Sequence, residues 1–370
     1  FTGLSKTIQN ELIESINTVI SEIIENEIKM SPFFSWQVDE TTDINCRSQV
    51  SVIFRYVKEG KAVERFMGFF DASEGRTAAD LFNLLIENFS KYDITNKLIG
   101  QTYDGASVMS GELNGLQSRV KQIAPQALFT HCYAHRLNLI LQDASTSIKE
   151  CRIFFANIKG FPTYFSKSTK RTNILDQMCT RRIPSGSDTR WNFKSRLINV
   201  IIEERDKLVL VFDKIIDSED FVRDGDAIRE AIGFKKILKN FNFLILLHIF
   251  SLIFEQTEFI FDIIQSKSTD ISYCKKRIEN LQQTLNNFRS NDNYFNKIYN
   301  TVSNITEPPN LSKKRKSNYD GIDDPKTYFK RVFNEILDII TTQIEVRFRD
   351  MATLDFLDLL NKDTFMSLRF

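Results

Sequence analysis

Two aspartates of this sequence each follow directly on a short apolar run. Asp39 ends a run that begins at Phe33, and Asp104 ends the run over residues 98–103. Two-metal cleavage of a phosphodiester needs carboxylates from different elements, converging on Mg²⁺ ions about 3.5–4 Å apart. Mg²⁺ takes a few hard carboxylate ligands together with water and phosphate, so a small set of acids suffices. Asp39 and Asp104 are therefore a candidate metal site, although an acid after a strand can also be a simple helix or turn cap.

The elements that would position these acids follow from the hydrophobic periodicity. Apolar residues recur at helical spacing over 4–30, and the short apolar run 33–38 predicts a strand. Apolar and polar side chains alternate over 49–57 and 62–70, which predicts a β-hairpin. A helix over 77–92, a strand over 98–103, a helix over 113–123 and a strand over 127–131 follow. A strand–helix–strand crossover places parallel strands side by side with their carboxyl ends together. We therefore expect both aspartates at one end of one mixed α/β sheet.

From residue 137 onward the periodicity is helical throughout, with predicted helices over 137–144, 148–165, 191–212, 227–241, 244–265, 271–288 and 328–348. A polar, proline-bounded linker over 307–325 contains the basic run Lys313-Lys314-Arg315-Lys316. The predicted domains are an N-terminal helix over 1–32, an α/β core over 33–165 and an all-helical region over 166–370.

Composition narrows the class of protein. The 370 residues carry 49 Lys and Arg against 48 Asp and Glu, so any contact with DNA must come from a local patch. Five scattered cysteines favour reduced thiols over a disulfide framework. The longest apolar run, 243–254, is shorter than the roughly 20 residues of a membrane span and predicts a buried helix, so no membrane is expected. The first residue is Phe1, and we interpret the chain as a fragment of a longer protein.

Four motifs in order resemble transposases of the hAT superfamily, especially the branch related to MYM-type zinc-finger proteins. They are residues 34–43 (FSWQVDETTD), 100–111 (GQTYDGASVMSG), 131–139 (HCYAHRLNL) and 189–191 (TRW). The resemblance implies an RNase H-like fold with a large all-helical insertion. It also implies that Asp39 and Asp104 are the first two acids of an Asp, Asp, Glu triad that uses Mg²⁺ or Mn²⁺.

The third acid of that triad is expected elsewhere. In the family it is a glutamate on a helix after the insertion, in a segment resembling Ala-(Ser/Ala)-Ala-Glu-Arg-x-Phe-Ser, and no such segment occurs here. Glu345 lies in a different context and does not match. The chain is therefore predicted to lack a complete active site, with the third acid beyond Phe370.

The motif over 131–139 raises two further possibilities. Cys132 and His135 have Cys-x-x-His spacing, which is half of a structural zinc site, but two more ligands at suitable spacing are missing. The resemblance instead places the motif beside the catalytic centre, where His131 or His135 would contact DNA phosphate. The alternative is a histidine packed at a strand-to-helix junction.

Arg190 and Trp191 are the remaining candidates for nucleic-acid binding. In the resembling transposases the equivalent aromatic stacks on bases at the cleaved end; the alternative is a Trp that anchors the start of a helix. Phosphate contacts would come from a basic stretch that could equally be a solvated loop. Its members are Lys167, Lys170, Arg171, Arg181, Arg182, Arg190, Lys194 and Arg196.

Two functions from different classes remain. The first is part of a hAT-type transposase, or a protein derived from one, that binds transposon-end DNA and is ancestrally a Mg²⁺-dependent strand-cleaving and strand-transferring enzyme. The second is a catalytically inactive, domesticated nuclear scaffold for regulatory interactions, since the glutamate motif is missing and the net charge is near zero. Nuclear localisation and a homo-oligomer formed through a segment beyond Phe370 are expected for either.

Overall fold

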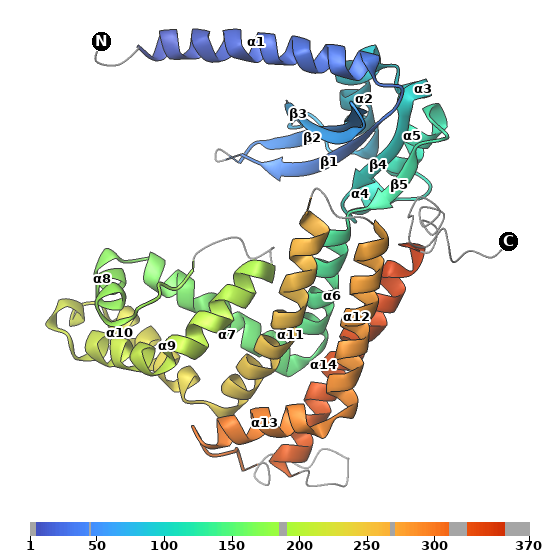
Figure 1. Ribbon diagram of the computed structural model, residues 1–370. Helices are drawn as coiled ribbons and strands as arrows, with labels where there is room; N and C mark the ends of the chain where they lie inside the picture. The colour runs from blue at the N-terminus through green and yellow to red at the C-terminus, as the bar shows by residue number, and fades with distance from the viewer. Residues whose placement is uncertain (1–4, 44–45, 185–190, 267–270, 311–323, 352–370) are drawn as a thin grey trace. The chain divides into compact units, whose positions relative to one another are not determined.

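The computed structural model describes residues 5–43, 46–184, 191–266, 271–310 and 324–351, with the backbone alone at 191 and 192. The chain separates into two compact units, Phe1–His135 and Arg136–Phe370. Figure 1 shows the sheet in the first and helices throughout the second.

The first unit is a mixed α/β layer structure. Its strands are β1 (Phe34–Thr42), β2 (Ser48–Lys58), β3 (Lys61–Asp71), β4 (Leu98–Tyr103) and β5 (Leu128–His131). Its helices are α1 (Lys6–Met30), α2 (Ala78–Phe89), η1 (Ser90–Tyr92), α3 (Ile94–Lys97), α4 (Ser107–Ser110) and α5 (Leu116–Ile123). α2 begins with a capping box in which Thr77 and Asp80 exchange hydrogen bonds, so the helix start is encoded locally.

The five strands lie in the order β3-β2-β1-β4-β5. β1, β2 and β3 are antiparallel, whereas β4 runs parallel to β1 and β5 parallel to β4. The parallel strands require crossovers, and α2 and α5 provide them. This confirms the predicted mixed sheet with flanking helices.

One face of the sheet is buried because its alternate residues are large and apolar. Trp36 and Phe54 are fully buried, and the indole N–H of Trp36 donates to the hydroxyl of Tyr103 at 2.8 Å. The amide of buried Gln101 donates to the carbonyls of Gln117 and Ala127 at 3.2 and 3.1 Å, which ties β4 to α5 and to the start of β5. β4, which leads to Asp104, is thus fixed by both packing and polar contacts.

Among the described residues, the contacts of α1 with the sheet lie near the C-terminal end of the helix. Ile28 is completely buried, and the carboxylate of Glu27 accepts hydrogen bonds from Tyr56 at 2.5 Å and Lys58 at 2.8 Å. Arg65 lies 3.1 Å from the same carboxylate. The pKa of Glu27 falls to about 2, chiefly because Lys58 and then Tyr56 donate to the ionised group.

The second unit is helical in every described element. After α6 (Tyr133–Ser147), which crosses the boundary between the units, it contains the following elements: α7 (Lys149–Ser166), α8 (Thr169–Met178), α9 (Trp191–Asp217), η2 (Glu219–Phe221), α10 (Gly225–Leu238), α11 (Phe241–Gln265), α12 (Ile271–Ser290), α13 (Asp292–Ser303) and α14 (Pro325–Phe348).

α11 forms the centre of the helical core. Its aromatic side chains pack against those of α7, with the rings of Phe154 and Phe250 stacked at a centroid distance of 5.5 Å. The helix is long and apolar enough by length and composition to span a membrane, but 61% of its most apolar window is buried inside the protein. The run was predicted to be too short for a span; the helix is in fact 25 residues long, and the prediction that it is buried holds.

The predicted helices and strands are found with ends shifted by a few residues, whereas α3, α4, α8, α13 and the short turn η2 were not assigned from the sequence. α3 and α4 are single turns, and α8 and α13 are short helices with many polar residues. The core was predicted to extend to residue 165, whereas the first compact unit ends at His135. The compact units are defined by contacts, whereas the predicted domains were defined by family resemblance. The predicted domain boundaries therefore stay a prediction. The basic run in the 307–325 linker lies outside the described residues.

Candidate active site at the carboxyl end of the sheet

Asp39 and Asp104 lie on neighbouring parallel strands at equivalent positions. The last paired residues of β1 and β4 are Gln37 and Thr102. Asp39 and Asp104 each come two residues later in the chain. Asp39 is still within β1, opposite Ser51 of β2, and is exposed. Asp104 comes directly after β4. The sheet register therefore brings the two predicted acids to the same end of the sheet.

The Asp104 carboxylate is held by a tight local turn. Its Oδ1 accepts a hydrogen bond from the backbone N–H of Ala106 at 3.0 Å, and α4 starts at Ser107. An aspartate that bonds the backbone two residues ahead forms an Asx turn, which orients the side chain. The second oxygen of this carboxylate is not used in that turn.

Gly105 is in contact with the histidines of the third motif. A Cβ placed on Gly105 would lie 2.6 Å from Cε1 and 2.7 Å from Nε2 of His131, and 3.5 Å from Cδ2 of His135. The two imidazole rings themselves lie 5.5 Å apart between centroids. The residue after Asp104 must therefore be glycine for His131 to approach the backbone this closely.

Cys132 joins the end of β4 to the start of α6. Its backbone N–H donates to the carbonyl of Tyr103 at 2.8 Å. Burial raises the pKa of the Cys132 thiol, and the negative charges of Asp39 and Asp104 raise it further, whereas hydrogen bonds from the backbone of His135 and Ala134 lower it. The β1–β4 register and the close approach of His131 to Gly105 bring the first three motifs to the same end of the sheet.

The donor set of this site suits a hard divalent cation better than zinc. Two carboxylates on adjacent strands match the preference of Mg²⁺ for a few protein oxygens, with water and phosphate completing the shell. Within the described part of the chain, no group of three or more His, Cys, Asp or Glu side chains is arranged to hold a metal ion. The Cys132–His135 pair thus gains no further zinc ligands among those residues.

The fourth motif is only partly described. Arg190 lies outside the described residues, and for Trp191 the structure gives the start of α9 but not the side chain. The sequence prediction that these residues bind nucleic acid stays a prediction.

Most of the predicted basic stretch is ion-paired with acids of the helical unit, largely at its surface. Five of its eight members form ion pairs: Lys167 with Glu230, Lys170 with Asp220, Arg171 with Asp224, Arg181 with Glu203 and Arg182 with Asp176. The side chain of Arg171 is only 8% exposed, and its guanidinium lies 4.4 Å from the centre of the Tyr164 ring. Four of the eight residues lie on α8 and α9, so the stretch is not the solvated loop that was the alternative. Its contact with phosphate stays a prediction.

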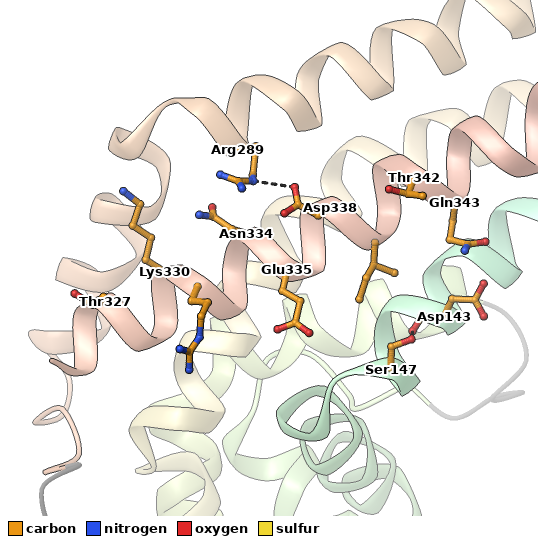
Figure 2. A pocket seen from close by; sticks show the side chains of 12 residues that line it. Asp143, Ser147, Arg289, Thr327, Lys330, Asn334, Glu335, Asp338, Thr342 and Gln343 are labelled. Atoms are coloured by element: carbon orange, nitrogen blue, oxygen red, sulfur yellow. Dashed lines mark hydrogen bonds and ion pairs between the residues drawn. The ribbon is translucent and has the colours of Figure 1, made fainter. Parts of the chain in front are cut away.

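A groove of about 1030 Å³ lies in the helical unit and is separate from the aspartates. α6, α12 and α14 line it, and Figure 2 shows its side chains to be mostly polar. Arg289 pairs with Asp338 at 2.8 Å across it, and Lys330 pairs with Asp292 at 2.5 Å. Because two of its cations are already paired, the groove shows no clear preference for a charged ligand.

Sequence reasoning did not foresee the contact between Gly105 and His131 or the electrostatic effect of both carboxylates on Cys132. The resemblance placed the motif over 131–139 beside the catalytic centre but gave no individual contacts. The distance between Gly105 and His131 depends on the β4–β5 register, in which Tyr103 pairs with His131.

Comparisons with known proteins agree with this geometry. Residues 2–115, which include both aspartates, match the family described as the ZMYM1/FAM200 RNase-like domain. The matched residues cover most of the first unit. The resemblance to the branch of MYM-type zinc-finger proteins is thereby confirmed.

Two relatives extend the similarity beyond the ZMYM1/FAM200 domain. The chain is 22% identical over 325 residues to the mouse and human proteins named "52 kDa repressor of the inhibitor of the protein kinase". The alignment covers 84% of this chain and 42% and 41% of the mouse and human proteins, respectively. The chain thus spans about two fifths of the length of these relatives, and the similarity includes most of the helical unit.

Proposed function

We propose that this chain is the RNase H-like part of a hAT transposase-derived protein that acts on DNA, and that Asp39 and Asp104 hold a divalent metal ion. The observation that carries the proposal is the register of β1 and β4, which sets the two acids side by side at the carboxyl end of the sheet. The RNase-like family match over the same residues supports it.

The chemistry assigned to each residue follows from this arrangement. Asp39 and Asp104 would bind Mg²⁺ or Mn²⁺, which would supply charge stabilisation at a phosphodiester. The Asx turn at Ala106 keeps the Asp104 carboxylate at the end of β4. We assign to His131 and His135, which lie next to Gly105, hydrogen bonds to a phosphate oxygen at the same site.

Metal binding by the full chain tests the proposal directly. Mn²⁺ binding is measured by electron paramagnetic resonance for the wild type and for Asp39→Asn and Asp104→Asn. Each substitution removes one carboxylate ligand, so we expect at least about tenfold weaker binding. The matched control is Asp71→Asn, an acid at the end of β3 on the same edge of the sheet but two strands away from β1. Equal Mn²⁺ affinity in all four proteins, or no binding by the wild type, would contradict the assignment.

DNA binding is tested separately by fluorescence anisotropy with duplex and single-stranded oligonucleotides over a range of salt concentrations. Trp191→Ala is expected to weaken single-strand binding about 5- to 100-fold if the indole stacks on a base. Trp36→Phe is unsuitable as a control because Trp36 is buried, so Tyr273→Phe, at an exposed position of α12, serves instead.

The second candidate function is a domesticated, catalytically inactive nuclear scaffold. It is favoured by the name of the two relatives, which describes a repressor of an inhibitor of a protein kinase. The pairing of five basic side chains inside the helical unit also leaves fewer cations for DNA. Failure of the wild-type chain to bind either Mn²⁺ or DNA would favour this function over the first.

A further inference from the structure

In the described part of the chain, no other element covers the N-terminal two thirds of α1, which we call the arm. Every side chain from residue 6 to residue 23 is exposed, although the segment is helical throughout. Seven large apolar side chains on this arm are each 43–65% exposed: Ile8, Leu12, Ile13, Ile16, Val19, Ile20 and Ile23. We call these seven residues the α1 stripe.

The arm is held firmly at its base. Glu25 pairs with Lys91 at 2.7 Å, and Lys97 donates to the backbone carbonyl of Lys29 at 2.8 Å. Together with buried Ile28 and the contacts of Glu27, these bonds fix the direction in which α1 leaves the sheet. Figure 1 shows α1 running past the ends of the neighbouring strands.

A helix with an exposed apolar face is stabilised when that face packs against a partner. Most helical stability in proteins comes from packing an amphipathic face, and short isolated helices are marginal in water. The stripe occupies positions that recur every three or four residues, so it forms one continuous apolar face. Contiguous exposed apolar faces of this kind mark interaction surfaces.

We propose that the α1 arm pairs antiparallel with the arm of a second copy of this chain. Leu12, Ile16, Val19 and Ile23 are separated by four, three and four residues, a spacing that reads the same in both directions. A two-fold axis across the middle of the series therefore sets Leu12 opposite Ile23 of the second copy and Ile16 opposite Val19. Such a self-complementary patch is what a closed two-fold dimer requires.

The side chains that flank these four residues also fit the antiparallel arrangement. Ile13 and Ile20, on one side of the series, lie opposite each other in the two copies. Ser15 lies opposite Glu22 on the other side, so no two acids face each other there. At 100° per residue, Glu11 and Glu14 lie on the side of the helix away from the stripe, and burying the stripe leaves them in water.

A parallel pair fits less well. In that arrangement Gln9 would meet Gln9 of the second copy inside the seam, following the usual pairing of seam positions in parallel coiled coils. The antiparallel pair sets Gln9 opposite Asn26 of the second copy instead, and this difference favours the antiparallel orientation. The proposal does not depend on the function proposed for Asp39 and Asp104.

The oligomeric state of the full chain tests the proposal. Light scattering after size exclusion, over a range of protein concentrations, is expected to give twice the chain mass for the wild type. Ile16→Glu places a charge in the apolar seam and should weaken association at least about 100-fold. Thr18→Glu, on the opposite side of the same helix, is the matched control and should remain dimeric. A wild type that is monomeric at all concentrations, or an Ile16→Glu variant that dimerises as well as Thr18→Glu, would overturn the proposal.

Disulfide trapping tests the orientation. A tagged Ile16→Cys chain and an untagged Val19→Cys chain are mixed and oxidised, with the wild type as the baseline for its five native cysteines. The antiparallel pair predicts that the mixed cross-link exceeds either self-cross-link, because the two positions face each other within disulfide reach. Predominant self-cross-linking at position 16 would show a parallel pair and overturn the proposed orientation.

Discussion

Gly105 allows no side chain because the ring of His131 occupies the space beside it. In Gly105→Ala the new methyl would lie 2.6 Å from Cε1 of His131, so the imidazole or the Asp104 turn must move. We expect a loss of about 1–3 kcal/mol in the free energy of unfolding and weaker Mn²⁺ binding. Urea denaturation and the Mn²⁺ titration measure the two effects.

A double-mutant cycle isolates the contact behind that prediction. Removing the ring in Gly105→Ala/His131→Ala should restore part of the stability, since the added methyl then meets open space. Gly233→Ala, where a Cβ meets nothing within 4 Å, is the control and should be neutral or slightly stabilising in its helix. Additive losses for the two substitutions would show that the steric contact is not the cause.

The hydroxyl of Tyr103 has a separate role one residue before Asp104. It is buried, and burial raises the pKa of Tyr103 well above its usual value. Tyr103→Phe would leave the indole N–H of Trp36 buried without its 2.8 Å acceptor, at a cost of about 1–3 kcal/mol in the free energy of unfolding. Thermal unfolding should show the loss, and unchanged stability would mean that another acceptor replaces the hydroxyl.

At the scale of elements, the attachment of α1 to the sheet depends on the ionised carboxylate of Glu27. The pKa of this group is lowered from 4.5 to about 2, because Lys58 and then Tyr56 donate hydrogen bonds to it. As the pH falls, the Glu27 carboxylate is therefore protonated at a higher pH in the unfolded chain than in the folded protein. The stabilisation is therefore complete above about pH 4.5 and is lost as the pH falls toward 2.

Glu27→Gln should accordingly lower the free energy of unfolding by about 1–3 kcal/mol at pH 7, and the difference from wild type should shrink as the pH approaches 2. Urea denaturation at pH 7, 4 and 2.5 follows the effect. Glu14→Gln, on the polar side of the exposed arm, should change stability little at any of these pH values. A difference between Glu27→Gln and wild type that is constant with pH would rule out the ionised carboxylate as its source.

At the scale of the whole molecule, each unit has its own hydrophobic core. Phe54 is fully buried in the sheet unit and Phe250 in the helical unit. We expect Phe54→Ala and Phe250→Ala each to cost about 3–5 kcal/mol. Hydrogen exchange followed by mass spectrometry should show the loss of protection mainly in the unit that carries the substitution. Equal loss in both units for either variant would show that the two cores unfold together.

The sequence by itself determined the order of the elements, the mixed sheet, the helical second half and the placement of Asp39 and Asp104 at strand ends. These features follow from local periodicity and from the rule that parallel strands share their carboxyl edge. The sequence did not reveal α3 and α4, which are single turns, or α8 and α13, which are short and largely polar.

Only the tertiary structure decided which side chains meet. The β4–β5 register brings His131 against Gly105, the ion pairs of the helical unit occupy much of the basic stretch, and the α1 stripe remains uncovered. Each of these depends on contacts between residues far apart in the chain, which periodicity cannot report. The two aspartates were evident as strand-end acids, but their shared influence on Cys132 required the fold.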